Sequence, residues 1–143
     1  MNGEHVLTES YSVRPGDFNA AGDASSSIKN LLKRLGVNTA AIRRVAIASY
    51  EAELNIIIHS LGGNLSLAVS RDFVSLVADD VGPGIEDVEQ AMVEGFSTAP
   101  ESVRMLGFGA GMGLSNMKRC ADDFYIESAP GRGTTIRMRF DVR

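Results

Sequence analysis

Hydrophobic and polar residues repeat with two different periods along the chain, and each change of period marks a boundary between predicted elements. A period of two predicts strands over residues 5–13, 64–70, 73–78, 124–128 and 134–142. Helical spacing predicts one helix that begins at Ser25 or Ser26 and stops at Gly36, a second from Asn38 or Thr39 to about Leu61, and two more over 86–93 and 114–121.

The order of these elements predicts the fold class. Strands arrive mostly as neighbouring hairpins with helices between them, which is typical of an α+β two-layer sandwich with one mixed, largely antiparallel sheet covered on one face by helices. The helix that ends near Leu61 is apolar around most of its circumference, so it is expected at the centre. At 143 residues the whole chain, 1–143, is expected to form a single domain.

Composition narrows the possible surroundings and partners. The single cysteine, Cys120, cannot form an internal disulfide, and no apolar stretch is long enough to cross a membrane or resemble a secretion signal. A cytoplasmic protein with no membrane association is therefore expected. The net charge is −4 and the basic residues are scattered, which predicts no direct binding of nucleic acid.

Residues 107–113 hold four glycines at alternate positions, directly before the helix predicted over 114–121. Because glycine loses much backbone freedom on folding, this density needs a reason. Unhindered N–H groups before a helix N-terminus can cradle a phosphate, and a hinge or tight turn is the alternative. The spacing fits neither a dinucleotide fingerprint nor a Walker-type loop. The polar passage before it, 95–107, is predicted to be a mobile loop.

A polar stripe runs along the predicted central helix, where Glu51, Asn55 and His59 are spaced by four. For His59 alone, an internal hydrogen-bond network is the favoured explanation. Glu51 has no Lys or Arg three or four positions away, so a group outside the helix has to meet its charge. A hydrated Mg²⁺ fits, because the ion prefers oxygen ligands and Asn55 can supply one.

Asp80 stands at the end of a predicted strand, just before Gly82 and Gly84. On its own, an Asp before a turn is more often a turn former. The two glycines change this interpretation, because they let a flat ligand lie against the backbone beside a fixed carboxylate. Such a carboxylate can accept a hydrogen bond from an exocyclic amino group, as on adenine.

These motifs together resemble those of a known family. Residues 51–55 resemble the N box of the GHKL ATPases, 80–85 the G1 box, and 107–113 with the distant Gly133-Thr134-Thr135 the G2 box and closing threonine. The family has the Bergerat fold and includes gyrase, MutL and histidine-kinase catalytic domains. Its members most similar in size and opening elements are stand-alone anti-sigma-factor serine/threonine kinases, which phosphorylate a small antagonist protein.

The resemblance implies a site residue by residue. Glu51 would be the general base, Asn55 the Mg²⁺ ligand, and Asp80 the adenine-binding carboxylate beside Gly82 and Gly84. The phosphates of ATP or ADP would lie on Gly107, Gly109, Ala110, Gly111, Met112 and Gly113, beneath a lid at about 95–107. Thr134 or Thr135 would support Asp80 or a water near adenine. The implied partner is an antagonist protein, and the resemblance also offers a sigma factor and a second copy of the chain in a homodimer as candidates.

One departure from the pattern keeps an alternative open. Several of these kinases carry an arginine where this chain has Gly109, so a cation for the γ-phosphate has to come from Arg104 or Lys118 or be missing. In the last case the chain would be a nucleotide-dependent binding module without phosphotransfer.

A sensor histidine kinase is set aside because the chain has no room for a dimerising hairpin. A larger ATPase machine would need further domains.

Overall fold

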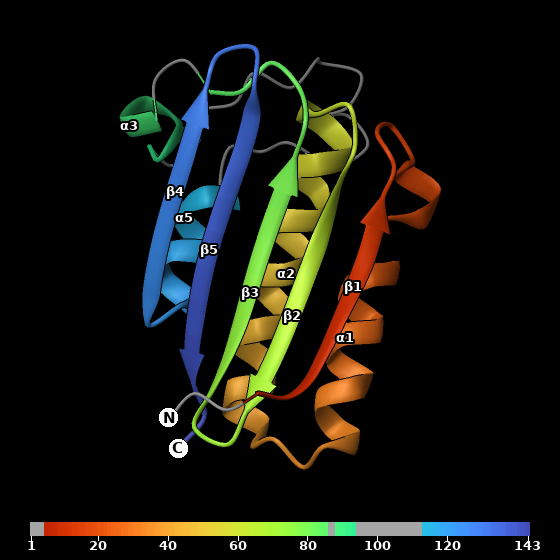
Figure 1. The fold of residues 1–143 in the computed structure, drawn as a ribbon, viewed down its shortest axis with the longest axis vertical. Coiled ribbons are helices and arrows are strands. Elements are labelled where there is room, and N and C mark those ends of the chain that lie inside the picture. Colours follow the sequence, from red (N-terminus) through yellow and green to blue (C-terminus); the bar gives the residue numbers. More distant parts are fainter. Residues whose placement is uncertain (1–4, 86–87, 94–112) are drawn as a thin grey trace.

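The computed structural model describes residues 5–85, 88–93 and 113–143. Figure 1 shows a sheet in front and the helices α1, α2 and α5 packed behind it, so these helices cover one face of the sheet. The predicted lid over 95–107 lies outside the described residues, as do Gly107, Gly109, Ala110, Gly111 and Met112.

The predicted elements are present, with small shifts at their ends. In chain order they are β1 (His5–Val13), the 3-10 turn η1 (Phe18–Ala20), α1 (Asp23–Arg34), α2 (Thr39–His59), β2 (Gly63–Ser70), β3 (Phe73–Asp80), α3 (Val88–Ala91), α5 (Gly113–Cys120), β4 (Asp123–Ala129) and β5 (Gly133–Asp141). The turn η1 was not predicted. The strand β3 continues to Asp80, two residues further than the expected end at residue 78.

The five strands lie in the order β1-β2-β3-β5-β4, and all four neighbouring pairs are antiparallel. The expectation of a largely antiparallel sheet with helices on one face is confirmed, and the described strands contain no parallel pair that would make the sheet mixed. Because β5 lies between β3 and β4, the start of the last strand is next to the end of β3. Asp79 pairs with Thr135 there, which brings two of the predicted motifs together.

The core lies between the sheet and the helices. Alternate residues of the central strands face the helices and are fully or nearly fully buried, as are the apolar residues of the three helices that meet them. The largest of these side chains are Ile28, Leu32, Val45, Ile56, Leu65, Leu67, Val74, Leu76, Met117 and Phe140.

The helix α2 lies between α1 and α5, as its predicted central position requires (Figure 1). Its apolar residues are nevertheless not all buried. Ile47 is 42% exposed and Tyr50 is 36% exposed, because the outer side of the helix layer faces away from the sheet. An apolar circumference therefore predicted the central position of this helix correctly, although part of its outer side is exposed.

The start of α1 differs from the sequence expectation. The helix begins at Asp23, and the Ser25 hydroxyl donates to the Gly22 carbonyl instead of capping the helix. The free N–H groups are met by Glu53 of α2, whose carboxylate accepts from Gly22 and Ala24 at 3.2 Å and from Ser25 at 3.1 Å. Glu53 is only 2% exposed, so a buried carboxylate takes the place of the predicted serine cap.

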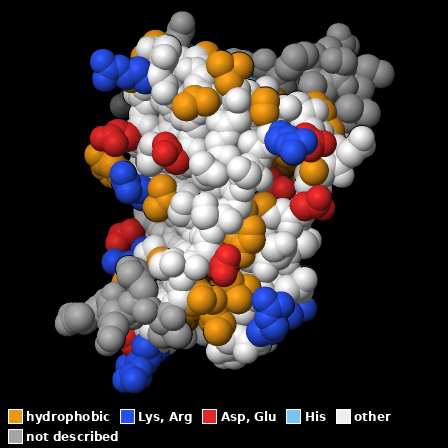
Figure 2. Space-filling model, turned by 45° about the vertical axis from the view of Figure 1, so that its right-hand side comes forward, with side chains coloured by type: hydrophobic (Ala, Val, Ile, Leu, Met, Phe, Trp, Pro, Cys, Tyr) orange, Lys and Arg blue, Asp and Glu red, His pale blue; other side chains and the backbone are white. Residues whose placement is uncertain are grey.

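The molecular surface is mixed in character. Figure 2 brings forward the side of the molecule that carries β1, and on this face Lys and Arg side chains alternate with Asp and Glu among uncharged atoms. Among the described residues, none of the helices combines the length and the apolar character that a membrane span requires.

Candidate functional site

The first part of the site lies between α2 and α5. A Cβ atom added to Gly113, the first residue of α5, would lie 3.4 Å from Oε1 of Glu51 and 3.6 Å from Oδ1 of Asn55. The last glycine of the predicted phosphate cradle is therefore directly beside Glu51 and Asn55 of the N-box motif. The structure brings these three residues together although the two motifs are distant in the sequence.

The other carboxylate oxygen of Glu51 is held by a residue that the sequence did not indicate. Asn116 of α5 donates from Nδ2 to Oε2 of Glu51 at 2.9 Å. Arg119, one helical turn further along α5, donates to Oδ1 of the same asparagine. Asn116 thus links the half-buried Glu51 to an exposed cation. The helical spacing over 114–121 predicted α5, whose buried residues are Leu114 and Met117, but it gave no sign of this polar contact.

Asn55 fits a role as a ligand of Mg²⁺ in a nucleotide complex. It is half-buried beside Gly113, and no other described residue hydrogen-bonds to its side chain. The described residues hold no cluster of three or more His, Cys, Asp or Glu side chains that could bind a metal alone. Mg²⁺ commonly takes one or two oxygens from a protein and the rest from phosphates and water, so the donor set suits this ion.

His59 is the last residue of α2 and lies at an exposed position. The internal hydrogen-bond network favoured for His59 from the sequence is not contradicted by this position and stays a prediction. Partial burial of its imidazole still lowers the pKa of His59 below its ordinary value. Of the predicted polar stripe, only Glu51 and Asn55 are beside the start of α5.

Asp80 forms the second part of the site, at the end of β3. The backbone N–H of Thr134 donates to Oδ1 of Asp80 at 3.0 Å, and no other described residue hydrogen-bonds to this carboxylate. Burial raises the pKa of Asp80, the Thr134 hydrogen bond partly offsets this shift, and the charge of Asp79 adds to it. The result is a fixed, partly desolvated carboxylate with its second oxygen available to a ligand.

The turn after Asp80 is fixed by close backbone contacts. A Cβ at Gly84, whose φ is +74°, would overlap the carbonyl oxygen of Ala129. One at Gly82 would lie 3.2 Å from the Cα atom of Ser60 at the end of α2. The two glycines of this motif are therefore required by the packing of the turn, whether or not a ligand lies against it.

Ser128 of β4, which the sequence did not indicate, connects this turn to β5. Its hydroxyl accepts from the Ile85 N–H at 2.8 Å and lies 2.8 Å from the Thr134 hydroxyl. Thr134 is thus the supporting threonine, through its backbone to Asp80 and its side chain to Ser128. Thr135 faces the opposite side of the sheet, where its hydroxyl donates to Asp79 at 2.7 Å, so of the two predicted threonines it is Thr134 that contacts Asp80.

The two parts of the site are linked through the end of α2. The Leu61 N–H donates to the Val81 carbonyl at 2.8 Å, and the Val81 N–H donates to the Gly62 carbonyl at 3.0 Å. In Figure 1 the ends of α2 and β3 and the start of β5 lie together at the top of the molecule. Of the two cations suggested for a γ-phosphate, Lys118 is exposed on α5, and Arg104 is outside the described residues.

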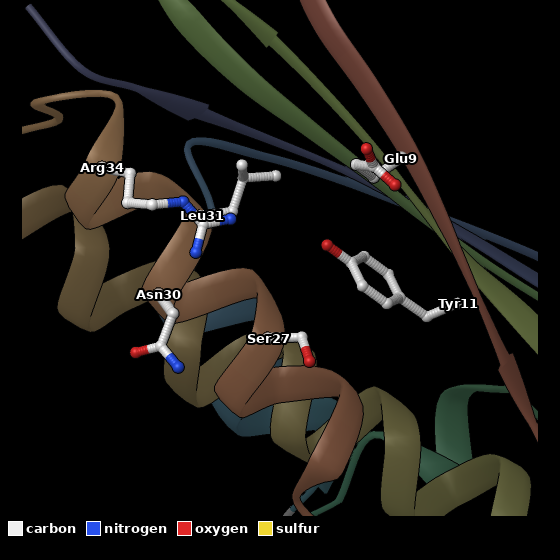
Figure 3. Close-up of a pocket in the computed structure, with 6 residues that line it drawn as sticks. All are labelled: Glu9, Tyr11, Ser27, Asn30, Leu31 and Arg34. Carbon is white, nitrogen blue, oxygen red and sulfur yellow. The ribbon is translucent and has the colours of Figure 1, made fainter.

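A separate groove lies at the other edge of the domain, between β1 and α1. It encloses about 290 Å³ and is lined by Glu9, Tyr11, Ser27, Asn30, Leu31 and Arg34. Figure 3 shows Tyr11 extending from β1 across the gap toward α1. Burial, and then the charge of Glu9, raise the pKa of Tyr11. The groove contains none of the predicted site residues.

Comparison with known proteins shows that the chain is similar to a family of ATPases and, within it, to a serine/threonine kinase and to anti-sigma factors. Residues 40–143 match the sequence profile of the histidine kinase-, DNA gyrase B-, and HSP90-like ATPases. The serine/threonine-protein kinase RsbT of Bacillus subtilis is 33% identical over 113 residues, which are 76% of this chain and 79% of RsbT. The anti-sigma F factor of Caldanaerobacter subterraneus is 37% identical over 102 residues, 68% of each chain. The anti-sigma F factor of Bacillus subtilis is 31% identical over 121 residues, 80% of each chain.

Proposed function

Because the chain belongs to the family of histidine kinase-, DNA gyrase B-, and HSP90-like ATPases, we propose that it is an anti-sigma-type serine/threonine kinase. It binds ATP with Mg²⁺ and transfers the γ-phosphate to a small antagonist protein. The observation that carries this proposal is the meeting of Glu51, Asn55 and Gly113 at the start of α5. A carboxylate, an amide oxygen and the end of a glycine-rich segment are together the groups that phosphoryl transfer to a hydroxyl requires.

Each residue of the proposed site has a separate role in nucleotide binding or phosphotransfer. Asp80 accepts a hydrogen bond from the adenine amino group through the oxygen that Thr134 leaves available. Asn55 supplies a ligand to Mg²⁺, which when bound neutralises phosphate charge. Glu51 takes the proton from the attacking serine or threonine hydroxyl, and its position beside Gly113 supports this role. The glycine-rich segment 107–113 provides N–H groups for the phosphates, and 95–107 covers them as a lid.

The names of the relatives support the choice of partners. One relative is named a serine/threonine-protein kinase and others are named anti-sigma F factors. For this chain, the acceptor is accordingly a small antagonist protein in the cytoplasm, and a sigma factor is a second protein partner. A homodimer is the proposed assembly.

A second candidate function is a nucleotide-dependent binding module without phosphotransfer. The observation in its favour is Gly109, where several related kinases carry an arginine, together with the exposed position of Lys118. In this case the nucleotide would still bind through Asp80 and Asn55, and the binding of ATP or ADP would set the affinity for the partner protein.

Transfer of labelled γ-phosphate separates the two candidates. The chain is incubated with γ-labelled ATP, Mg²⁺ and candidate antagonists encoded by neighbouring genes, and the proteins are separated on a gel. We expect label on one antagonist, at a serine or threonine identified by mass spectrometry, and loss of label when EDTA removes Mg²⁺. Tight ATP binding and stable complexes with the antagonist, but no label, would instead identify a binding module.

A further inference from the structure

The contact between Asn116 and Glu51 suggests why only one oxygen of this carboxylate is free for chemistry. Oε1 of Glu51 lies on the side of Gly113 and Asn55, where the phosphates are proposed to bind. Oε2 accepts from Nδ2 of Asn116 at 2.9 Å. The two oxygens of the carboxylate are therefore in different surroundings before any ligand binds.

Arg119 determines which way round the Asn116 amide lies. An asparagine side chain has one accepting oxygen and one donating nitrogen, and a flip exchanges them. The Arg119 guanidinium has only donors, so it binds Oδ1 and turns Nδ2 toward the Glu51 carboxylate. In the flipped orientation the amide oxygen would face the carboxylate, and the amide nitrogen would face the guanidinium. Both contacts would then be repulsive.

We propose that Asn116 is a positioning residue for phosphotransfer. Its side chain, oriented by Arg119, holds Oε2 of Glu51 so that Oε1 faces the acceptor hydroxyl. This inference rests on the proposed kinase function and adds the α5 side chains that set the geometry of its base. The reaction itself is the same as in the proposed function. The acceptor hydroxyl gives its proton to Oε1, the hydroxyl oxygen bonds to the γ-phosphorus, and the bond between the γ-phosphorus and the ADP oxygen breaks. Asn116 takes no proton.

The central test is a set of variants measured in phosphotransfer to the antagonist. Asn116→Leu keeps a similar volume but removes the donor, so we expect kcat to fall about tenfold, the effect of losing one hydrogen bond to a charged group. The KM for ATP and the affinity for ADP should stay within about twofold, because Asp80 and Asn55 are untouched. Asn116→Gln retains an amide and should recover part of the loss. Asn30→Leu, the same change at an exposed site on α1, is the matched control and should leave kcat unchanged.

Arg119 is tested by its dependence on Asn116. Alone, Arg119→Met should lower kcat by a few-fold. In the Asn116→Leu background it should have almost no further effect, because Arg119 acts on Glu51 only through its hydrogen bond to Asn116. Equal effects in both backgrounds would overturn the orienting role. The side-chain amide resonance of Asn116 in the nucleotide-free protein provides a readout without activity, and it should move in both Arg119→Met and Glu51→Gln.

The outcomes distinguish this inference from the proposed function. If the parent protein transfers phosphate and Asn116→Leu has the parental kcat, the positioning role is wrong and the kinase function stands. If the parent binds ATP but transfers no phosphate to the antagonist, the proposed function itself is wrong. A fall in ADP affinity equal to the fall in kcat would assign Asn116 to general support of the fold, which also overturns the inference.

Discussion

At the scale of single residues, Asp80 has the surroundings of a binding group that costs the free protein some stability. Its carboxylate is partly buried and lies beside the like charge of Asp79, with one N–H donor from Thr134 as compensation. A bound adenine amino group would supply the second donor. The same desolvation that raises the pKa of Asp80 therefore prepares the carboxylate for a ligand.

Asp80→Asn should weaken nucleotide binding. The substitution keeps the side-chain shape but exchanges an accepting oxygen for a donating nitrogen facing the adenine amino group. We expect the affinity for Mg-ADP to fall by roughly 1–3 kcal/mol, the cost of leaving a buried polar group unpaired. Titration calorimetry measures this directly. Affinity equal to that of the parent would show that adenine is not recognised by Asp80.

The same variant should behave differently in the absence of nucleotide. Because the folded-state pKa of Asp80 is raised above 3.8, the folded protein binds this proton more tightly than the unfolded chain. The contribution of Asp80 to stability is therefore largest below that value and is lost as pH rises through the raised pKa. Asparagine does not titrate, so Asp80→Asn should gain in melting temperature relative to the parent across this interval. A difference between the two proteins that stays constant with pH would contradict the assignment.

At the scale of elements, two glutamates of α2 have different roles, one in the proposed reaction and the other in the stability of the fold. Glu51 lies beside the start of α5 and is assigned to chemistry, whereas Glu53 is buried and caps the N-terminus of α1. Glu53→Gln leaves one accepting oxygen where three N–H groups need partners. We expect it to lower the free energy of unfolding by about 1–3 kcal/mol in urea denaturation.

Glu9→Gln is the matched control for this stability prediction. Glu9 is exposed on β1, so the same change in charge and chemistry should alter the free energy of unfolding by less than about 0.5 kcal/mol. If both variants lose the same stability, the cap on α1 contributes nothing beyond an ordinary surface charge.

The element scale also shows what the sequence could predict. The two hydrophobic periods predicted the helices and strands with small errors at their ends, because burial on one face leaves a local pattern. The start of α1 was misplaced because its cap, Glu53, comes from another helix. Thr135 was grouped with Thr134 although consecutive strand residues face opposite sides, so the period itself could have separated them.

The site was predictable only where its residues belong to motifs. Glu51, Asn55 and Asp80 could be named as candidates because each lies in a contiguous pattern, and the structure places the first two beside Gly113 and the third beside Thr134. Asn116 and Ser128 were missed, since their contacts depend on how α5 packs against α2 and how β4 pairs with β5. Such contacts follow from tertiary packing and leave no local signal.

At the scale of the whole molecule, nucleotide binding should stabilise the fold. The proposed site joins the end of β3, the start of β5, α2 and α5, so a bound ligand holds elements from most of the chain. Mg-ADP at a hundred times its dissociation constant should add about 2.7 kcal/mol to the free energy of unfolding. The melting temperature measures this, with Asp80→Asn at the same nucleotide concentration as the weakened control. An unchanged melting temperature in the parent would contradict a nucleotide site.

The most direct test of the kinase assignment compares chemistry and binding in Glu51→Gln. The variant retains Asn55, Asp80 and the glycine-rich segment, so its affinity for Mg-ADP should remain close to that of the parent. It lacks the base that takes the hydroxyl proton, which is typically worth about 10²–10⁴-fold in rate. We predict that single-turnover transfer of the γ-phosphate to the antagonist falls by this factor. Transfer at the parental rate would show that Glu51 is not the base.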